Sequence, residues 1–156
     1  MIFVIKGAMI KEISEGKNHK AIDIGSFDQL SEYSFIHPKF GTEDKSRLFT
    51  GELLKSTGAE ISFRELAPDT TVPFLHGHHQ HEEIYIFIKG KGKYQVDNHI
   101  FEIKEGSMVR VSPRGSRTLS NTSDKGMIYM VVQSRTGSLA GYNISDGYRI
   151  DGEVKV

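Results

Sequence analysis

Short runs of apolar and β-branched residues, separated by turn-forming residues, are the main pattern along the middle of the chain. Seven runs predict strands: Arg47 to Leu54, Glu60 to Leu66, Glu82 to Lys89, Lys93 to Val96, Ile100 to Ile103, Met108 to Val111 and Met127 to Gln133. Most are separated by glycine- or asparagine-containing breakers, such as Gly90-Lys91-Gly92 and Asp97-Asn98. No long segment of this region has the apolar period of a helix. Strands that recur about every 8 to 12 residues are typical of a sandwich or barrel, so we predict an all-β fold.

The pattern is weaker at the two ends of the chain. Met1 to Ile5 could form a strand, and Ser26 followed by Gln29 is a capping-box pattern that predicts a short helix reaching about Tyr33. From Thr136 onward the chain is polar and rich in glycine. We therefore expect an N-terminal extension over 1–45 that packs on the β-domain, the β-domain itself over 46–134, and a C-terminal arm or edge strand over 135–156.

Composition and charge exclude several classes of protein. The 156 residues include 20 basic and 20 acidic residues and no cysteine. A chain of this length buries a sizeable core in one domain, and its balanced charge gives no net field to attract nucleic acid or anionic lipid. The apolar runs are too short to span a bilayer and the N-terminus does not resemble a signal peptide, so we expect a cytoplasmic protein without nucleic-acid or membrane partners. Without cysteine, any metal ion must be held by nitrogen and oxygen.

Four of the seven histidines fall within six positions, immediately before a predicted strand: His76, His78, His79 and His81. Residues two apart in an extended chain project to the same side, so His76 and His78 can approach one point. Glu83 opens the following apolar run, and its strand can present the carboxylate to that point. Two imidazoles and one carboxylate form the facial triad favoured by non-haem Fe(II) and acceptable to Mn, Co, Ni or Zn. A polar loop in which histidines simply accumulated would predict no relation between the spacing of the histidines and the position of Glu83 on the following strand.

The stretch from His76 to Gly90 resembles the first sequence motif of the cupin superfamily. That motif reads H-x-H, three or four residues, E, six residues, G, and the spacing to Gly90 selects Glu83 rather than Glu82 as its carboxylate. A stretch similar to the second motif begins at Gly106 and ends near Asn121. The resemblance covers roughly Ser46 to Ser134. It implies a small single-domain cupin, a double-stranded β-helix (jelly-roll) barrel with its site in the barrel mouth.

Two positions depart from the cupin pattern. Thr70 replaces a glycine, which affects only a turn. Arg117 stands where the second motif normally supplies a third histidine, and a protonated guanidinium is no metal ligand. Three roles are open for Arg117. It could bind the carboxylate or phosphate of a substrate beside the metal, it could replace the metal by pairing with Glu83 and leave a pocket for an organic ligand, or it could be an ordinary surface arginine.

Alternation along the strand assigns further residues to the inside and outside of the barrel. With Glu83 facing inward, Tyr85 faces inward too, near enough to the mouth to offer its hydroxyl for proton transfer, and a free His81 could play the same part. The apolar residues between these positions face outward: Ile84, Ile86 and Ile88. An apolar outward face predicts cover by another segment or by a second subunit, so a homodimer is expected.

The cupin fold serves dioxygenases, decarboxylases, isomerases, epimerases, lyases and non-catalytic sensors, so the fold does not select a function. The first hypothesis is an enzyme in which His76, His78 and Glu83 hold a divalent Fe, Mn, Ni, Co or Zn ion that acts on a small polar, anionic metabolite anchored by Arg117. The three-ligand site favours dioxygenase chemistry, with isomerase or lyase chemistry as alternatives. The second hypothesis is a module that binds a small molecule without turning it over. A purely structural oligomer gives no reason for the register of the histidines and Glu83.

Overall fold

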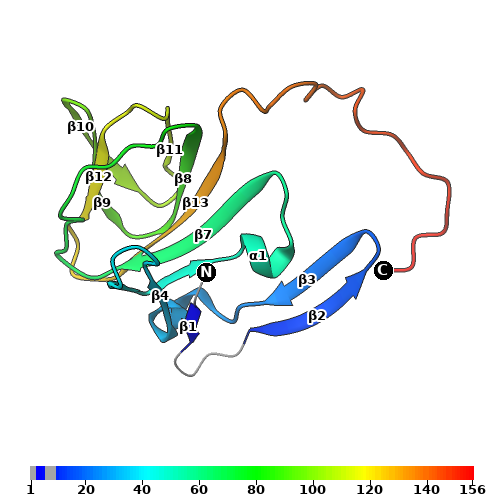
Figure 1. Cartoon of the computed structure of the whole chain (residues 1–156), viewed down its shortest axis with the longest axis horizontal. Helices are drawn as coiled ribbons and strands as arrows, with labels where there is room; N and C mark the ends of the chain where they lie inside the picture. Colours follow the sequence, from blue (N-terminus) through cyan, green and yellow to red (C-terminus); the bar gives the residue numbers. More distant parts are fainter. Residues whose placement is uncertain (1–2, 6–9) are drawn as a thin grey trace.

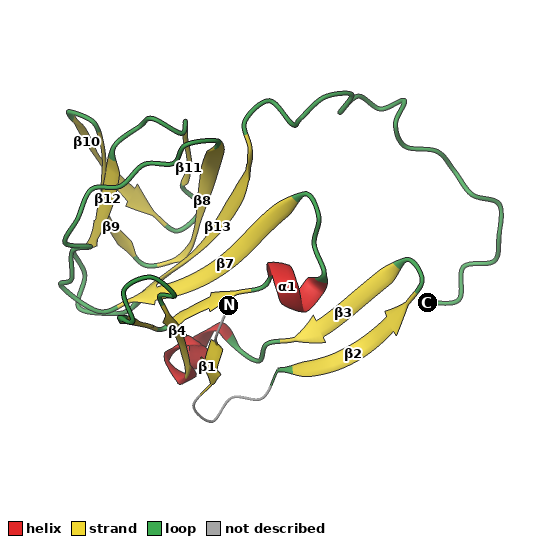
Figure 2. Cartoon of the chain, in the orientation of Figure 1, coloured by secondary structure: helices red, strands yellow, loops and turns green. Residues whose placement is uncertain are grey.

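The computed structural model describes residues 3–5 and 10–156, and strands dominate this part of the chain (Figure 2). The first six strands are β1 (Phe3–Ile5), β2 (Lys11–Gly16), β3 (His19–Asp23), β4 (Tyr33–Ile36), β5 (Glu43–Lys45) and β6 (Arg47–Phe49). The others are β7 (Ala59–Leu66), β8 (His81–Lys89), β9 (Lys91–Val96), β10 (His99–Lys104), β11 (Met108–Val111), β12 (Arg117–Asn121) and β13 (Met127–Arg135). The predicted all-β class is therefore confirmed.

Two antiparallel sheets form the barrel (Figure 1). One has the strand order β11-β8-β13-β7-β6 and the other the order β10-β9-β12. Aromatic and aliphatic side chains from both sheets fill the space between them, among them Tyr85 and Phe87 of β8, Tyr94 of β9 and Leu119 of β12. As expected from alternation, Tyr85 and Phe87 are buried inside the barrel, with exposed fractions of 4% and 1%.

The N-terminal segment packs on the outside of the larger sheet. The 3₁₀ helix η1 (Phe27–Glu32) begins at the capping box that the sequence predicted, with Ser26 accepting from Asp28 and Gln29 accepting from Ser26. Its Leu30 joins Tyr33, Leu48 and Ile128 in a second apolar cluster. The strand expected at Met1 to Ile5 is present as β1, whereas residues 1–2 and 6–9 of the expected extension lie outside the described residues.

One predicted strand is wrong in its second half. The sequence predicted a strand over Arg47 to Leu54, but β6 ends at Phe49 and the short helix α1 (Gly51–Leu54) follows. The reason is a contact from a distant part of the chain. The Glu60 carboxylate accepts hydrogen bonds from the amides of Thr50 (3.0 Å) and Gly51 (2.7 Å), which caps the start of the turn.

Several strands of the structure were absent from the sequence prediction, among them β2, β3 and β12. The β2–β3 hairpin escaped because β2 is exposed along its whole length and has no buried face. Strand β12 escaped because two of its three inward side chains, Arg117 and Asn121, are polar. Beyond β13, residues 136–156 contain no helix or strand. In the described residues, no helix is long and apolar enough to cross a membrane.

Candidate metal centre

The backbone of the segment between β7 and β8 holds the two histidines of the H-x-H motif against β12. His76 and Arg117 exchange backbone hydrogen bonds of 3.2 and 3.0 Å, and the His78 amide donates to the Pro113 carbonyl at 2.8 Å. Gly77 lies between them, and a Cβ atom at that position would come within 3.1 Å of the Pro113 oxygen. The absence of a side chain at Gly77 therefore allows the close approach that fixes both imidazoles.

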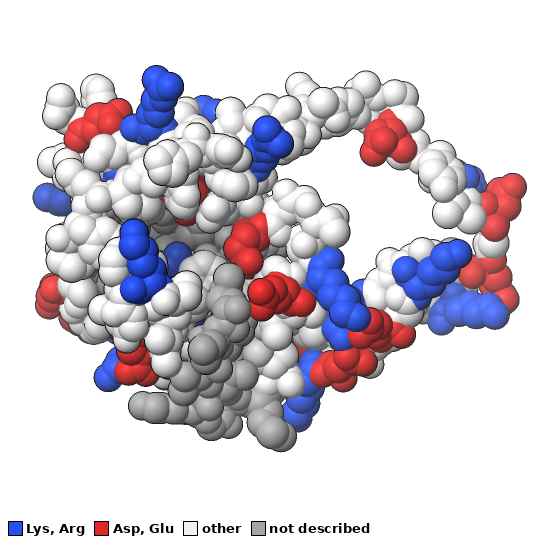
Figure 3. Space-filling model, in the orientation of Figure 1, with Lys and Arg blue, Asp and Glu red and all other residues white. Residues whose placement is uncertain are grey.

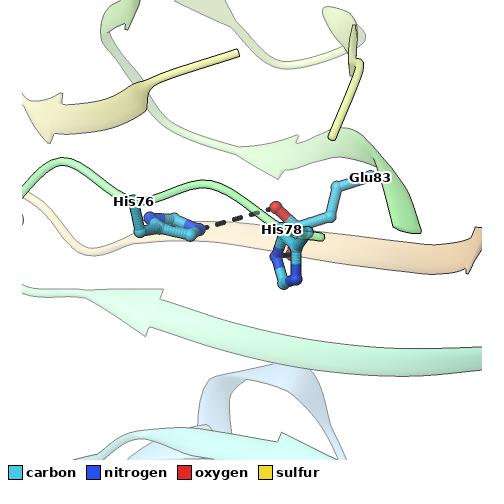
Figure 4. A group of neighbouring side chains, drawn as sticks. All are labelled: His76, His78 and Glu83. Carbon is cyan, nitrogen blue, oxygen red and sulfur yellow. Dashed lines mark ion pairs between the residues drawn. The ribbon is translucent and has the colours of Figure 1, made fainter. Parts of the chain in front are cut away.

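Glu83, on the inward face of β8, meets both imidazoles (Figure 4). Its Oε1 lies 3.2 Å from His78 Nε2, and its Oε2 lies 3.6 Å from His76 Nε2. Ligand atoms of the three residues all fall within 4.8 Å of one another. His78 Nε2 is buried and lacks a hydrogen-bond partner among the described residues. Such a buried nitrogen is costly unless a partner such as a metal ion satisfies it.

The electrostatics of the site keep His78 and Glu83 in the protonation states that metal ligands need. Burial lowers the pKa of His78, an effect that the Glu83 charge only partly opposes, so the imidazole is held neutral. Burial by itself would raise the pKa of Glu83. The neighbouring His76 and the Arg117 guanidinium outweigh burial and hold that pKa well below its usual range, so the carboxylate is ionised.

Arg117 is fully buried, with an exposed fraction of 0%, so its interpretation as a surface arginine is wrong. Its Nε and Nη2 donate to Glu83 Oε2 at 3.0 and 2.7 Å, and its Nη1 donates to the Gly115 and Pro113 carbonyls at 2.8 and 3.3 Å. The side chain thus pairs with Glu83 from inside the protein. Because the guanidinium has no exposed surface, it cannot offer its N–H groups to a ligand arriving from solvent. This geometry disfavours the first of the three roles, that of a substrate anchor.

Tyr85, two residues after Glu83 on the same face of β8, donates its hydroxyl to Glu83 Oε2 at 2.9 Å. Burial, with the Glu83 charge second, raises the pKa of this phenol, so it remains a hydrogen-bond donor. Glu83 Oε2 is therefore occupied by Arg117 and Tyr85, whereas Oε1 faces His78. The donor set fits a divalent ion held by His76, His78 and one carboxylate oxygen, Oε1.

His81 lies apart from this group, although it shares the inward side of β8. It lines a pocket of about 660 Å³ together with residues of α1, the following loop and the end of β13. Among the described residues that line this pocket, none belongs to the His76, His78 and Glu83 group. The lining also includes Gln133 and Arg135, which the sequence analysis missed. Only strand register could have identified them, since Gln133 pairs with Glu83 and Arg135 pairs with His81.

Comparisons with known proteins agree with this architecture. The family model described as "Cupin domain" matches residues 62–133. The uncharacterized protein MJ1618 of Methanocaldococcus jannaschii is 33% identical over 95 residues, which cover 58% of this chain and 74% of that protein.

Two solved structures illustrate the range of similarity. The crystal structure of a cupin protein (BF4112) from Bacteroides fragilis has a TM-score of 0.64 and 38% identity, covering 67% of this chain and 88% of its own. A putative sugar phosphate isomerase from Acidithiobacillus ferrooxidans has a TM-score of 0.52 and 21% identity, covering 57% of this chain and 58% of its own, and shares the fold alone.

Proposed function

Starting from the fact that this chain is a small single-domain member of the cupin superfamily, we propose that it is a metal-dependent enzyme acting on a small polar, anionic metabolite. His76, His78 and Glu83 would hold a divalent Fe, Mn, Ni, Co or Zn ion. The observation that carries the proposal is the buried His78 Nε2, which has no hydrogen-bond partner among the described residues and lies 3.2 Å from an ionised carboxylate. A divalent ion there would supply Lewis-acid chemistry or, if redox-active, oxygen chemistry.

The remaining residues of the site act on Glu83. Arg117 and Tyr85 both hold Oε2, which fixes the rotation of the carboxylate and leaves Oε1 directed at His78. Arg117 is in this sense a positioning residue that orients a ligand. Tyr85, protonated and 4% exposed, steadies the same oxygen. Dioxygenase chemistry is our first choice because the ligand set is two histidines and one carboxylate, with isomerase or lyase chemistry as alternatives.

The pocket beside the metal group supports an anionic ligand. Gln133 of β13 pairs directly with Glu83 of β8, and two residues further along β13 Arg135 pairs directly with His81. Directly paired residues share a sheet face, so the pocket and the metal group are neighbours on the inner face of β8 and β13. The basic side chains that β8 and β13 contribute to the pocket are His81 and Arg135. Glu60, which pairs with Gln133 from the neighbouring strand β7, is already engaged with the amides at the start of α1. Arg135 thus takes over the anchoring role first expected of Arg117.

Replacing Arg135 tests the anion assignment. Small carboxylates and phosphate monoesters would be screened for those that raise the melting temperature of the metal-loaded protein. We expect Arg135→Gln to weaken binding of the stabilising compounds roughly tenfold, because a charge-assisted hydrogen bond is lost. Arg110→Gln, on the outer side of the sheet, is the matched control and should bind as the wild type does. Equal affinity in Arg135→Gln and the wild type would remove Arg135 from the ligand site.

A binding protein without turnover is the second candidate, and one observation favours it. The Arg117 guanidinium lies 2.7 Å from the carboxylate that would ligate the ion, so a permanent positive charge competes with a divalent cation for Glu83. In that case the Arg117–Glu83 pair stands in place of the metal, and the pocket takes an organic ligand directly. Metal content separates the two candidates.

The deciding measurement is elemental analysis of protein purified without chelator. We expect about one equivalent of a divalent metal in the wild type and almost none in His78→Ala, because that variant loses the unpartnered nitrogen. His79→Ala is the matched control: His79 is exposed, and metal content there should be unchanged. Absence of metal from the wild type even after reconstitution would overturn the metal site in favour of the binding protein. Full metal content in His78→Ala would remove His78 from the ligand set.

A further inference from the structure

The C-terminal arm, defined here as residues 136–156, lies outside the barrel with every residue exposed. It leaves the end of β13 and loops away from the barrel, with open space between the two, and its end lies near the β2–β3 hairpin in this view (Figures 1 and 3). The arm nevertheless carries large apolar side chains, each at least 74% exposed: Leu139, Tyr142, Ile144, Tyr148, Ile150, Val154 and Val156. Apolar surface on this scale is unfavourable in water unless something covers it.

The order of residues in the arm is that of strands with one apolar face. Three apolar–polar–apolar triplets follow one another: Tyr142-Asn143-Ile144, Tyr148-Arg149-Ile150 and Val154-Lys155-Val156. Turn-forming Asp146-Gly147 and Asp151-Gly152 separate them. This period of two is typical of a half-buried strand, yet residues 136–156 form no strand in the single chain. The pattern therefore indicates a surface on which the arm becomes ordered.

The outward face of the larger sheet offers such a surface. Strand register places Met108, Ile86 and Met130 in one row across β11, β8 and β13, and Ile84 beside Val132 in the next. These five residues, called the outer stripe, are on the side opposite the buried Tyr85 and Phe87. The N-terminal cluster covers the part of this face that adjoins the outer stripe, at Ile88, Ile128 and Phe63, and includes none of the five stripe residues. Met108 is 65% exposed, and the four other residues of the outer stripe are partly exposed.

We infer that two copies of this chain associate by exchanging their arms, each arm packing its apolar side chains on the outer stripe of the other copy. Each chain carries both an arm and an outer stripe, so a two-fold symmetric pair forms the same arm–stripe contact twice. The exposed apolar residues amount to roughly 1,000 Å² per arm, and two buried arms reach the roughly 1,600 Å² typical of a stable interface. The arm also sets out away from its own barrel, which favours the stripe of a second copy over its own (Figure 1).

The first test is the mass of the full-length protein in solution at micromolar concentration, by light scattering or sedimentation. We expect twice the 17.5 kDa of one chain for the wild type. The arm variant Ile144→Asp/Ile150→Asp and the stripe variant Met108→Asp should each shift to the mass of a single chain. Because all three residues are exposed, the barrel should stay folded and still unfold cooperatively on heating. Asn143→Asp/Ser145→Asp adds the same charge as the arm variant at polar positions and should keep the wild-type mass.

A crosslinking experiment identifies which chain each arm contacts. Because the chain has no cysteine, Met108→Cys and Ile144→Cys can be made in separate, differently tagged chains and joined with a short bis-maleimide. A covalent pair formed only from the mixture is the expected result. A single-chain mass for the wild type would overturn the inference. A chain that carries both cysteines is the control: crosslinking confined within that one chain would also overturn the inference, since the arm would then fold back on its own barrel.

Discussion

Glu83→Gln is expected to lower the free energy of unfolding by about 3–5 kcal/mol, because it leaves a fully buried guanidinium without its counter-charge. Arg117 has an exposed fraction of 0% and directs Nε and Nη2 to a single oxygen of Glu83, at 3.0 and 2.7 Å. The amide of glutamine keeps the shape of the carboxylate but not its charge. Urea unfolding of metal-free protein measures the loss separately from any contribution of a bound ion.

The adjacent residue provides a matched control. Glu82 also pairs with an arginine, since its carboxylate accepts from Arg110 Nε at 2.9 Å, but that pair lies on the outer side of the sheet and the Arg110 side chain is 54% exposed. Glu82→Gln should therefore cost less than about 1 kcal/mol. Combining Glu83→Gln with Arg117→Met removes both buried charges and should recover most of the lost stability. Equal, small losses in the two single variants would contradict the structure, since Arg117 would then have reached solvent.

Asn121→Ala should cost about 3 kcal/mol of stability and lower the melting temperature by roughly 10 °C. The Asn121 side chain is 1% exposed, and its Nδ2 donates to the Leu66, Ala67 and Lys125 carbonyls at 3.0, 3.1 and 2.6 Å. Its Oδ1 accepts from the amide and hydroxyl of Ser123 at 3.0 and 2.7 Å. This one amide ties the end of β12 to the end of β7 and to the turn before β13.

Thermal unfolding of metal-free Asn121→Ala and Asn98→Ala would measure that contribution. Asn98 lies in the exposed turn between β9 and β10, so its replacement should change the melting temperature by no more than a degree or two. Metal binding in Asn121→Ala, measured well below its melting temperature, should be retained because Asn121 does not belong to the ligand group. A melting temperature equal to that of Asn98→Ala would mean that water replaces all the lost hydrogen bonds.

The sequence predicted the strands of the barrel well where one face of a strand is continuously apolar. Strand β11 was predicted at its observed bounds, Met108–Val111, and β8 began only one residue earlier than expected. Prediction was wrong from Thr50 to Leu54, where the Glu60 carboxylate caps a helical turn. That cap comes from a residue 10 positions away, and no local pattern reveals it. Strand β12 was missed because its inward side chains include an arginine and an asparagine.

By itself, the sequence determined the fold class, the family and the approach of His76 and His78 to Glu83. The fold class follows from the strand pattern, and the family from the resemblance of His76 to Gly90 to the first cupin motif. The approach of the three side chains follows from alternation, which fixes which residues of an extended chain share a face. Only the tertiary structure decided the role of Arg117, because burial of a charged side chain depends on partners that offset its desolvation cost, and the local sequence does not show them. Here Glu83 and two backbone carbonyls meet it from distant parts of the chain, and the electrostatic cost of burial is offset by that pairing. The pairing of β13 with β8 likewise placed Arg135, and not Arg117, on the wall of the pocket.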